Sequence, residues 1–176
     1  MEERAWLADA SSLIYIAKCN AFEAMNRCMG VLAVPPGVWK EAVEHGERIG
    51  AGEVPRIRLA VKAGFVIRVG LPSRAERLAK VIASEQRLGR GESEVLALTR
   101  PGDPCLIDEG RASRVASDRR LRPLSTILVP VLGARRGRIG VDEARELIRC
   151  LGAAANATAQ VLLAAERELV GGNHED

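Results

Sequence analysis

Two aspartates in this chain each end a short apolar run. The runs are 6–9 (WLAD) and 105–108 (CLID), and helix-like sequence follows each of them. This pattern indicates two buried parallel strands with Asp9 and Asp108 at their carboxyl ends. Open α/β sheets bind ligands at that edge, and neighbouring carboxylates repel each other unless a cation lies between them. The two runs therefore predict an acidic site for Mg²⁺ or Mn²⁺.

Short apolar runs and amphipathic stretches alternate along the first 140 residues. Strands are expected at 6–9, 31–34, 65–69, 105–108 and 122–125. Helices are expected at 10–27 with Ser11 or Ser12 as the cap, from 35 onwards, and at 55–63, 72–87, 92–100, 111–117 and 127–136, with a glycine-rich loop at 46–52. This alternation predicts a three-layer α/β/α fold with a central parallel sheet of about five strands.

The chain is expected to form one α/β domain over residues 1–140, followed by a helical pair. The pair, at 141–151 and 157–170, shows no strand pattern and is expected to pack on the same domain or to form a dimer contact. The last residues, 171–176, are predicted to be a disordered tail.

Composition excludes several classes of protein. No stretch approaches the roughly 18 apolar residues needed to span a bilayer, and the N-terminus lacks the layout of a secretory signal, so a cytoplasmic protein without a membrane partner is expected. The net charge of +3 is only a weak indication of a nucleic-acid partner. Aromatic residues make up 3% of the chain, which argues against a base-stacking platform for single strands.

Cysteine and histidine offer little chemistry. The four cysteines, Cys19, Cys28, Cys105 and Cys150, are widely spaced, so buried free thiols are expected rather than a zinc site or a disulfide framework. The two histidines, at 45 and 174, lie in no motif. A histidine-dependent ribonuclease or metallohydrolase is therefore disfavoured.

Five motifs in order resemble the PIN-domain ribonucleases of the VapC-like prokaryotic type. They are LADASSLIYIAK, VPPGVWKEAV, LGRGESEVLALT, LIDEGRASRVA and LSTILVPVLGARRGRI, and the resemblance covers about residues 6–139. It implies an α/β/α domain with three or four clustered acidic residues and divalent-metal-dependent hydrolysis of RNA. It also implies the toxin of a VapBC-type toxin–antitoxin pair, whose partners would be RNA, an antitoxin protein and a second copy of the chain.

The resemblance implies a site residue by residue. Asp9 matches the first acidic position, Glu41 the second and Asp108 the fourth. Alone, each of these is as well explained by a helix cap or an exposed helix charge, and only their joint placement at one sheet edge favours a metal site. Further polar candidates are Ser11, Glu94, Glu109 as a contact of a second metal, Arg114, and Thr126 as a hydroxyl that orients a ligand or phosphate.

The third acidic position is either Glu92 or Glu94. Residues two positions apart on a helix differ by about 200° of rotation, so the two side chains cannot readily face the same ion. Counting back from the end of ESEVLALT places Glu92 at the family's third position, and Glu94 is expected to cap the first helical turn. Glu92 is therefore the predicted ligand.

Three other classes remain as alternatives. A phosphotransfer enzyme with a nucleophilic aspartate usually needs a second Asp two residues on, where this chain has Ser11. A receiver-type signalling domain needs a lysine after the fifth strand, and none follows. The third alternative is a catalytically weak PIN-like module that binds RNA or a partner protein. The complete set of carboxylates favours an active nuclease over this third class.

Overall fold

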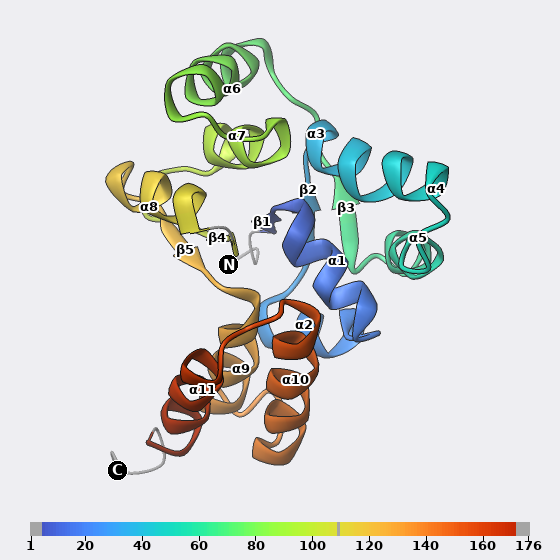
Figure 1. The fold of residues 1–176 in the computed structure, drawn as a ribbon, viewed down its shortest axis with the longest axis vertical. Helices are drawn as coiled ribbons and strands as arrows, with labels where there is room; N and C mark the ends of the chain where they lie inside the picture. The colour runs from blue at the N-terminus through green and yellow to red at the C-terminus, as the bar shows by residue number, and fades with distance from the viewer. Residues whose placement is uncertain (1–4, 109, 172–176) are drawn as a thin grey trace.

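A five-stranded parallel sheet forms the centre of the computed structural model, which describes residues 5–108 and 110–171 (Figure 1). The strands are β1 (Trp6–Ala8), β2 (Leu32–Val34), β3 (Val66–Arg68), β4 (Pro104–Leu106) and β5 (Arg122–Leu124). Their spatial order is β3-β2-β1-β4-β5, and every neighbouring pair is parallel. The chain therefore changes direction across the sheet between β1 and β4, and ligands bind at such a switch point in open α/β sheets.

The strand register brings the two aspartates to that switch point. Ala8 pairs with Leu106, and the main-chain N–H of Asp9 donates to the carbonyl of Leu106 at 3.1 Å. Asp108 follows two residues after the end of β4. Both aspartates therefore leave the sheet at its carboxyl edge, as the sequence predicts.

Helices surround the sheet on both faces, so the three-layer α/β/α fold is confirmed (Figure 1). They are α1 (Ala10–Lys18), α2 (Phe22–Met29), α3 (Pro36–Trp39), the π-helix η1 (Lys40–His45), α4 (Gly46–Arg48), α5 (Val54–Lys62), α6 (Ser73–Gln86), α7 (Arg90–Leu98), α8 (Gly110–Asp118), the 3₁₀ helix η2 (Thr126–Leu128), α9 (Val129–Arg135), α10 (Val141–Ala154) and α11 (Ala159–Gly171). All five strands lie where the sequence predicts them.

The sequence expectation was wrong for the first helix. Residues 10–27 form two helices, because Asn20 adopts a left-handed backbone conformation (φ +50°) between α1 and α2. The cap is also neither Ser11 nor Ser12 but Asp9, whose side chain accepts the main-chain N–H of Ser12. Both serines already lie within the first helical turn.

The expected loop at 46–52 begins later than predicted. The chain stays helical through α4 to Arg48. Gly46 is buried and does not form a turn; a Cβ atom there would lie 2.7 Å from a methyl group of Val54. Gly46 therefore allows α4 and α5 to pack closely. Composition alone cannot distinguish a glycine needed for close packing from a glycine in a loop.

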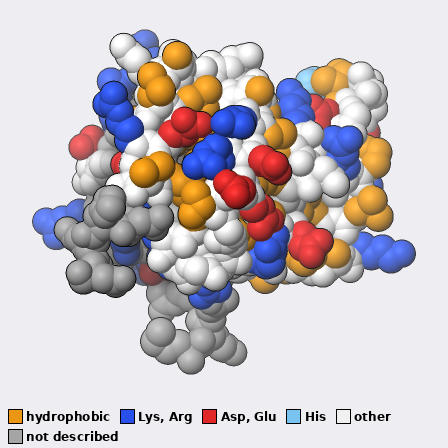
Figure 2. Space-filling view, turned by 90° about the horizontal axis from the view of Figure 1, so that it is seen from below, with side chains coloured by type: hydrophobic (Ala, Val, Ile, Leu, Met, Phe, Trp, Pro, Cys, Tyr) orange, Lys and Arg blue, Asp and Glu red, His pale blue; other side chains and the backbone are white. Residues whose placement is uncertain are grey.

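The C-terminal helices lie away from α6 and α7, at the bottom of the view in Figure 1. Helix α10 packs against α1, α9 and η2, and α11 packs against α9 and α10. Ion pairs join α2 to α10, through Arg27 and Glu143, and α9 to α11, through Arg135 and Glu168. From below, acidic and basic side chains accordingly lie beside one another (Figure 2). Of the tail expected at 171–176, all but Gly171, the last residue of α11, lies outside the described residues.

The expectation of four free thiols was wrong for one pair. Cys19, at the end of α1, forms a disulfide with Cys150 of α10, with the two Cα atoms 5.8 Å apart. The two residues are 131 positions apart, so spacing could not reveal a pairing that the packing of α10 on α1 creates. Cys28 and Cys105 are buried free thiols as predicted, and burial raises the pKa of each to about 11.

None of the helices in the described part of the chain is long and apolar enough to cross a lipid bilayer.

We expect the Cys19–Cys150 disulfide to stabilise the protein. The disulfide closes a loop of 131 residues and so restricts the unfolded chain. Loss of the disulfide should lower the free energy of unfolding by about 4–5 kcal/mol. Denaturant titration with and without a dithiol reductant measures this difference. The Cys150→Ser variant should match the reduced parent and show no response to the reductant. Equal midpoints for the parent in both conditions would mean that the bridge does not form in solution.

Candidate functional site

Asp9 lies in the turn between β1 and α1 and is tied directly to the main chain of Asp108. Its Oδ1 accepts the N–H of Ser12 at 2.8 Å, which caps α1. Its Oδ2 accepts the N–H of Asp108 at 3.2 Å. The side chain is 2% exposed. One carboxylate thus joins the carboxyl ends of the two central strands.

The Asp108 carboxylate accepts four hydrogen bonds from side chains and main chain. Oδ1 accepts the Ser125 hydroxyl at 2.7 Å and the Thr126 N–H at 3.0 Å. Oδ2 accepts the Ser12 hydroxyl at 2.8 Å and the hydroxyl of Thr126. These donors come from α1 and from the turn between β5 and η2, so the orientation of this carboxylate depends on both elements.

Burial raises the pKa of Asp9 from its ordinary value of 3.8 to about 6. The loss of water around the charge is the largest cause, and the nearby negative charge of Asp108 adds to it. The hydrogen bonds from Ser12 and Asp108 offset part of this shift. At neutral pH the fold therefore holds an ionised carboxylate that would gain from any positive charge beside it.

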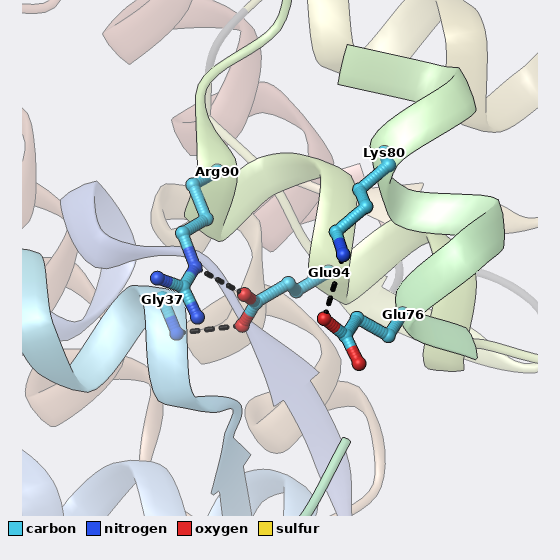
Figure 3. A network of polar contacts seen from close by, with 5 residues as sticks. All are labelled: Gly37, Glu76, Lys80, Arg90 and Glu94. Atoms are coloured by element: carbon cyan, nitrogen blue, oxygen red, sulfur yellow. Dashed lines mark hydrogen bonds and ion pairs between the residues drawn. The ribbon is translucent and has the colours of Figure 1, made fainter. Parts of the chain in front are cut away.

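The two glutamates of α7 have roles opposite to those expected in capping. Glu92, the third helical residue, accepts the Gly89 N–H at 2.8 Å and so caps the start of α7, whereas Glu94 was expected to cap. Glu94 is 2% exposed instead; its Oε2 accepts the N–H of Gly37 and its Oε1 accepts Nε–H of Arg90, each at 2.6 Å (Figure 3). The capping expectation was wrong because α7 begins at Arg90, two residues earlier than expected, which makes Glu92 the third helical residue.

Glu41 lies in η1, exposed and beside the first turn of α7. A Cβ atom on Gly91 would come within 3.3 Å of Glu41 Oε2 and 3.1 Å of a Val38 methyl group. The acidic side chains therefore form two groups, one at Asp9 and Asp108 and one where α3 and η1 meet α7. Within residues 5–108 and 110–171, no three acidic, histidine or cysteine side chains converge closely enough to hold one metal ion.

This fold and its paired aspartates agree with a comparison to protein families. A family model described as a PIN domain matches residues 5–165. The chain belongs to the PIN-domain family. No curated protein and no solved structure matches the chain. PIN domains are generally nucleases and typically use divalent metals.

The donors of this PIN domain suit a hard divalent cation. Asp9 and Asp108 offer only carboxylate oxygens, and Mg²⁺ is commonly bound by one or two carboxylates with waters and substrate phosphates as its other ligands. Burial first, and the charge of Asp108 second, raise the pKa of Asp9, so a cation beside it would stabilise its ionised form. The pair thus fits Mg²⁺ or Mn²⁺ without a third protein ligand.

The other predicted site residues of the PIN domain lie in different surroundings. Ser11 is partly exposed on α1, and its neighbour Ser12 makes the contact to Asp108. Thr126 is fully buried, and its hydroxyl donates to Asp108 and so orients a carboxylate. Arg114 is exposed on α8. Glu109 lies outside the described residues.

Four residues of this region were not predicted from the sequence: Ser12, Gly37, Arg90 and Ser125. A signal existed for Ser12, because it follows Asp9 at the three-residue spacing of a helix cap and its third helical position. Arg90 lies four residues before Glu94 on α7, which is the spacing of a helical ion pair, so a signal existed for it as well. Gly37 and Ser125 are joined to the acidic residues only through tertiary contacts.

A cavity of about 570 Å³ in the PIN domain lies elsewhere. Its lining includes Trp6 and Pro104, at the starts of β1 and β4, together with Met29, Arg100 and Arg138. None of the four predicted carboxylates lines it. The chemistry of the carboxyl edge, and not cavity size, therefore locates the candidate site.

Stability of the metal-free protein should fall as pH rises from about 4 to about 6. Because the pKa of Asp9 is about 6 in the folded state and an ordinary 3.8 in the unfolded chain, the folded state binds this proton more tightly within that window. The free energy of unfolding should therefore decrease by up to about 3 kcal/mol and level off above pH 6. Urea titrations at several pH values, with a chelator present, measure this slope.

The Asp9→Asn variant should lose that part of the slope, while the Asp142→Asn control, which changes an exposed acid on α10, should keep it. Parallel curves for the parent and Asp9→Asn would contradict the raised pKa.

Replacing Gly37 by alanine should destabilise the contact between α3 and α7. The added Cβ would lie 2.9 Å from Cδ and Oε2 of Glu94 and 3.0 Å from Cγ of Arg90, so the buried carboxylate must move. Such overpacking costs about 1–3 kcal/mol. Thermal melting of Gly37→Ala against the control Gly70→Ala, where a Cβ meets open space, checks this expectation. If both variants melt alike, Glu94 is not fixed against Gly37.

Proposed function

We propose that this PIN domain is a divalent-metal-dependent endoribonuclease that hydrolyses RNA phosphodiester bonds with Asp9 and Asp108 as its metal ligands. The hydrogen bond between Asp9 Oδ2 and the Asp108 N–H is the observation that carries this proposal, because it fixes two carboxylates side by side at the switch point of the sheet. Such an arrangement of like charges is costly for the fold unless a cation is part of its working state.

The side chains have separate roles in this proposal. Asp9 and Asp108 would hold the cation through their oxygens, and Ser12, Ser125 and Thr126 keep Asp108 in a single orientation. When bound, Mg²⁺ or Mn²⁺ polarises the scissile phosphate and lowers the pKa of the attacking water. Without a cation the pKa of Asp9 is about 6, and its proton competes with the metal, so affinity for the cation should decline as pH falls below that value.

The finer ligand set stays a prediction. Glu92 was expected as the third ligand, but its carboxylate accepts the Gly89 N–H, and Glu41 lies against Gly91. Glu41 and Glu92 remain candidate ligands of the cation, through a direct bond or a bound water. The proposal therefore rests on the two aspartates.

Positive charge near the same edge would suit an RNA strand. Arg68 ends β3, is exposed, and lies over the ring of Trp39 with 4.4 Å between its guanidinium carbon and the ring centroid. The planar contact restrains the guanidinium while leaving it accessible to phosphate. By resemblance to VapC-like proteins, we extend the proposal to the toxin of a toxin–antitoxin pair, with an antitoxin protein and a second copy of the chain as further partners.

A fluorescent RNA cleavage assay tests the proposed reaction. The parent should cleave with millimolar Mg²⁺ or Mn²⁺ and stop when EDTA is added. Asp9→Asn and Asp108→Asn should each lower the rate by at least about 100-fold, because charge is removed from a ligand at nearly constant size. The control Asp142→Asn, on the distant α10, should keep the parent rate.

Two outcomes would change the proposal. RNA binding without cleavage under any metal condition would favour the RNA-binding module. Cleavage that survives Asp9→Asn would place the reaction elsewhere on the domain.

A further inference from the structure

Arg90 is the first residue of α7, and its side chain is held at Nε although most of it is exposed. Its side chain is 63% exposed, yet its Nε–H donates at 2.6 Å to Oε1 of Glu94, whose side chain is 2% exposed. The other Glu94 oxygen accepts the Gly37 N–H (Figure 3). The carboxylate is thus held by α3 and in turn holds the guanidinium by one nitrogen.

The terminal nitrogens of Arg90 remain available. A guanidinium has five N–H donors, and the hydrogen bonds of Arg90 to the described residues use only the one on Nε. The remaining four belong to Nη1 and Nη2, whose planar geometry matches two oxygens of a phosphate. An arginine fixed through Nε loses little further rotamer entropy on binding, so it is well suited to take an anion.

The position of Arg90 places these donors at the same edge of the sheet as the paired aspartates. Gly37 lies in α3, which directly follows β2, and α7 packs against both α3 and β1. Because β2 neighbours β1 in the sheet, Arg90 and Asp9 lie at the same carboxyl edge. From this position the guanidinium of Arg90 can contact an RNA strand whose scissile bond lies at the aspartates.

There is also room for a ligand beside Arg90. A cavity of about 320 Å³ between α6 and α7 is lined by Arg90, Glu94, Lys80 and Ser93, among others. Ser93 is fully buried, and its hydroxyl has no hydrogen-bond partner among the described residues. The acidic groups in this cavity are already paired, Glu94 with Arg90 and Glu76 with Lys80 at 2.8 Å (Figure 3). Each carboxylate in the cavity thus already has a positive partner, which lowers its repulsion of an incoming phosphate.

We infer that Arg90 binds a backbone phosphate of the RNA strand next to the bond that is cleaved, and that Glu94 is the positioning residue that anchors it. The inference rests on the proposed ribonuclease function. It assigns Glu94 to substrate binding through Arg90 and leaves metal binding to Asp9 and Asp108. A lysine in place of Arg90 would keep the charge but would present a single ammonium group, which cannot pair with Glu94 and also chelate two phosphate oxygens.

The experiment compares Arg90→Ala, Arg90→Lys and Glu94→Gln with the parent and with Arg167→Ala, which removes an exposed arginine from the distant α11. Three quantities are measured: kcat and KM for RNA cleavage in Mn²⁺, affinity for the same RNA in EDTA across a salt series, and Mn²⁺ affinity by calorimetry without RNA. Thermal melting confirms that each variant is folded. If Arg90→Ala is not folded, Arg90→Lys replaces it in the comparison.

We expect Arg90→Ala to weaken RNA affinity and raise KM by about 5- to 10-fold, with Mn²⁺ affinity unchanged. The slope of log affinity against log salt should decrease by about 0.7, the value for one lost phosphate contact on a single strand. Arg90→Lys should fall between the parent and Arg90→Ala, Glu94→Gln should resemble Arg90→Lys, and Arg167→Ala should match the parent.

Unchanged RNA affinity and KM in Arg90→Ala would overturn the inference, and a change in Mn²⁺ affinity alone would make Arg90 a counter-ion of the metal site. If the parent binds RNA but does not cleave it, the proposed reaction fails while the salt series still decides the role of Arg90. If the parent neither binds nor cleaves RNA, both proposals fall.

Discussion

Two aspartates that would repel each other are fixed at adjoining strand ends, and much of the fold serves that constraint. Asp9 is buried, caps α1 and accepts the main-chain N–H of Asp108. Each of these contacts opposes separation of the two carboxylates. The raised pKa of Asp9 is the thermodynamic sign that the contacts do not fully balance burial and repulsion. A cation at this edge would relieve that imbalance.

The surrounding elements determine how firmly the pair is held. Ser12 in α1 and the Ser125–Thr126 turn donate to Asp108 from two directions. Helix α10 packs against both α1 and η2, and its disulfide to Cys19 fixes it to the end of α1. The C-terminal helices therefore support the two elements that orient Asp108, although they contribute no side chain to the acidic pair.

The second acidic group is arranged in a different way. Glu94 is as buried as Asp9, but a guanidinium and a main-chain N–H already satisfy its two oxygens. Buried carboxylates that are paired in this way position other groups well, because moving either partner leaves an uncompensated charge. Asp9 and Asp108 are carboxylates with no cation among their hydrogen-bond donors in the described part of the chain, whereas Glu94 is paired with the guanidinium of Arg90. On physical grounds the first is the place for a metal ion, and the second is a support for an arginine.

The sequence by itself determined the fold class, the five strands and the meeting of Asp9 and Asp108. Short apolar runs and the residues directly after them are local features, and parallel strands necessarily bring their carboxyl ends to one edge. Only the tertiary structure decided that Glu94 is buried against Gly37 and that Cys19 pairs with Cys150. The capping of α7 by Glu92 and the Arg90–Glu94 pair are local contacts, but which residue caps depends on where the helix begins. Contacts between residues more than fifty positions apart depend on how helices pack. Neither the first residue of a helix nor its packing is encoded in the spacing of a single motif.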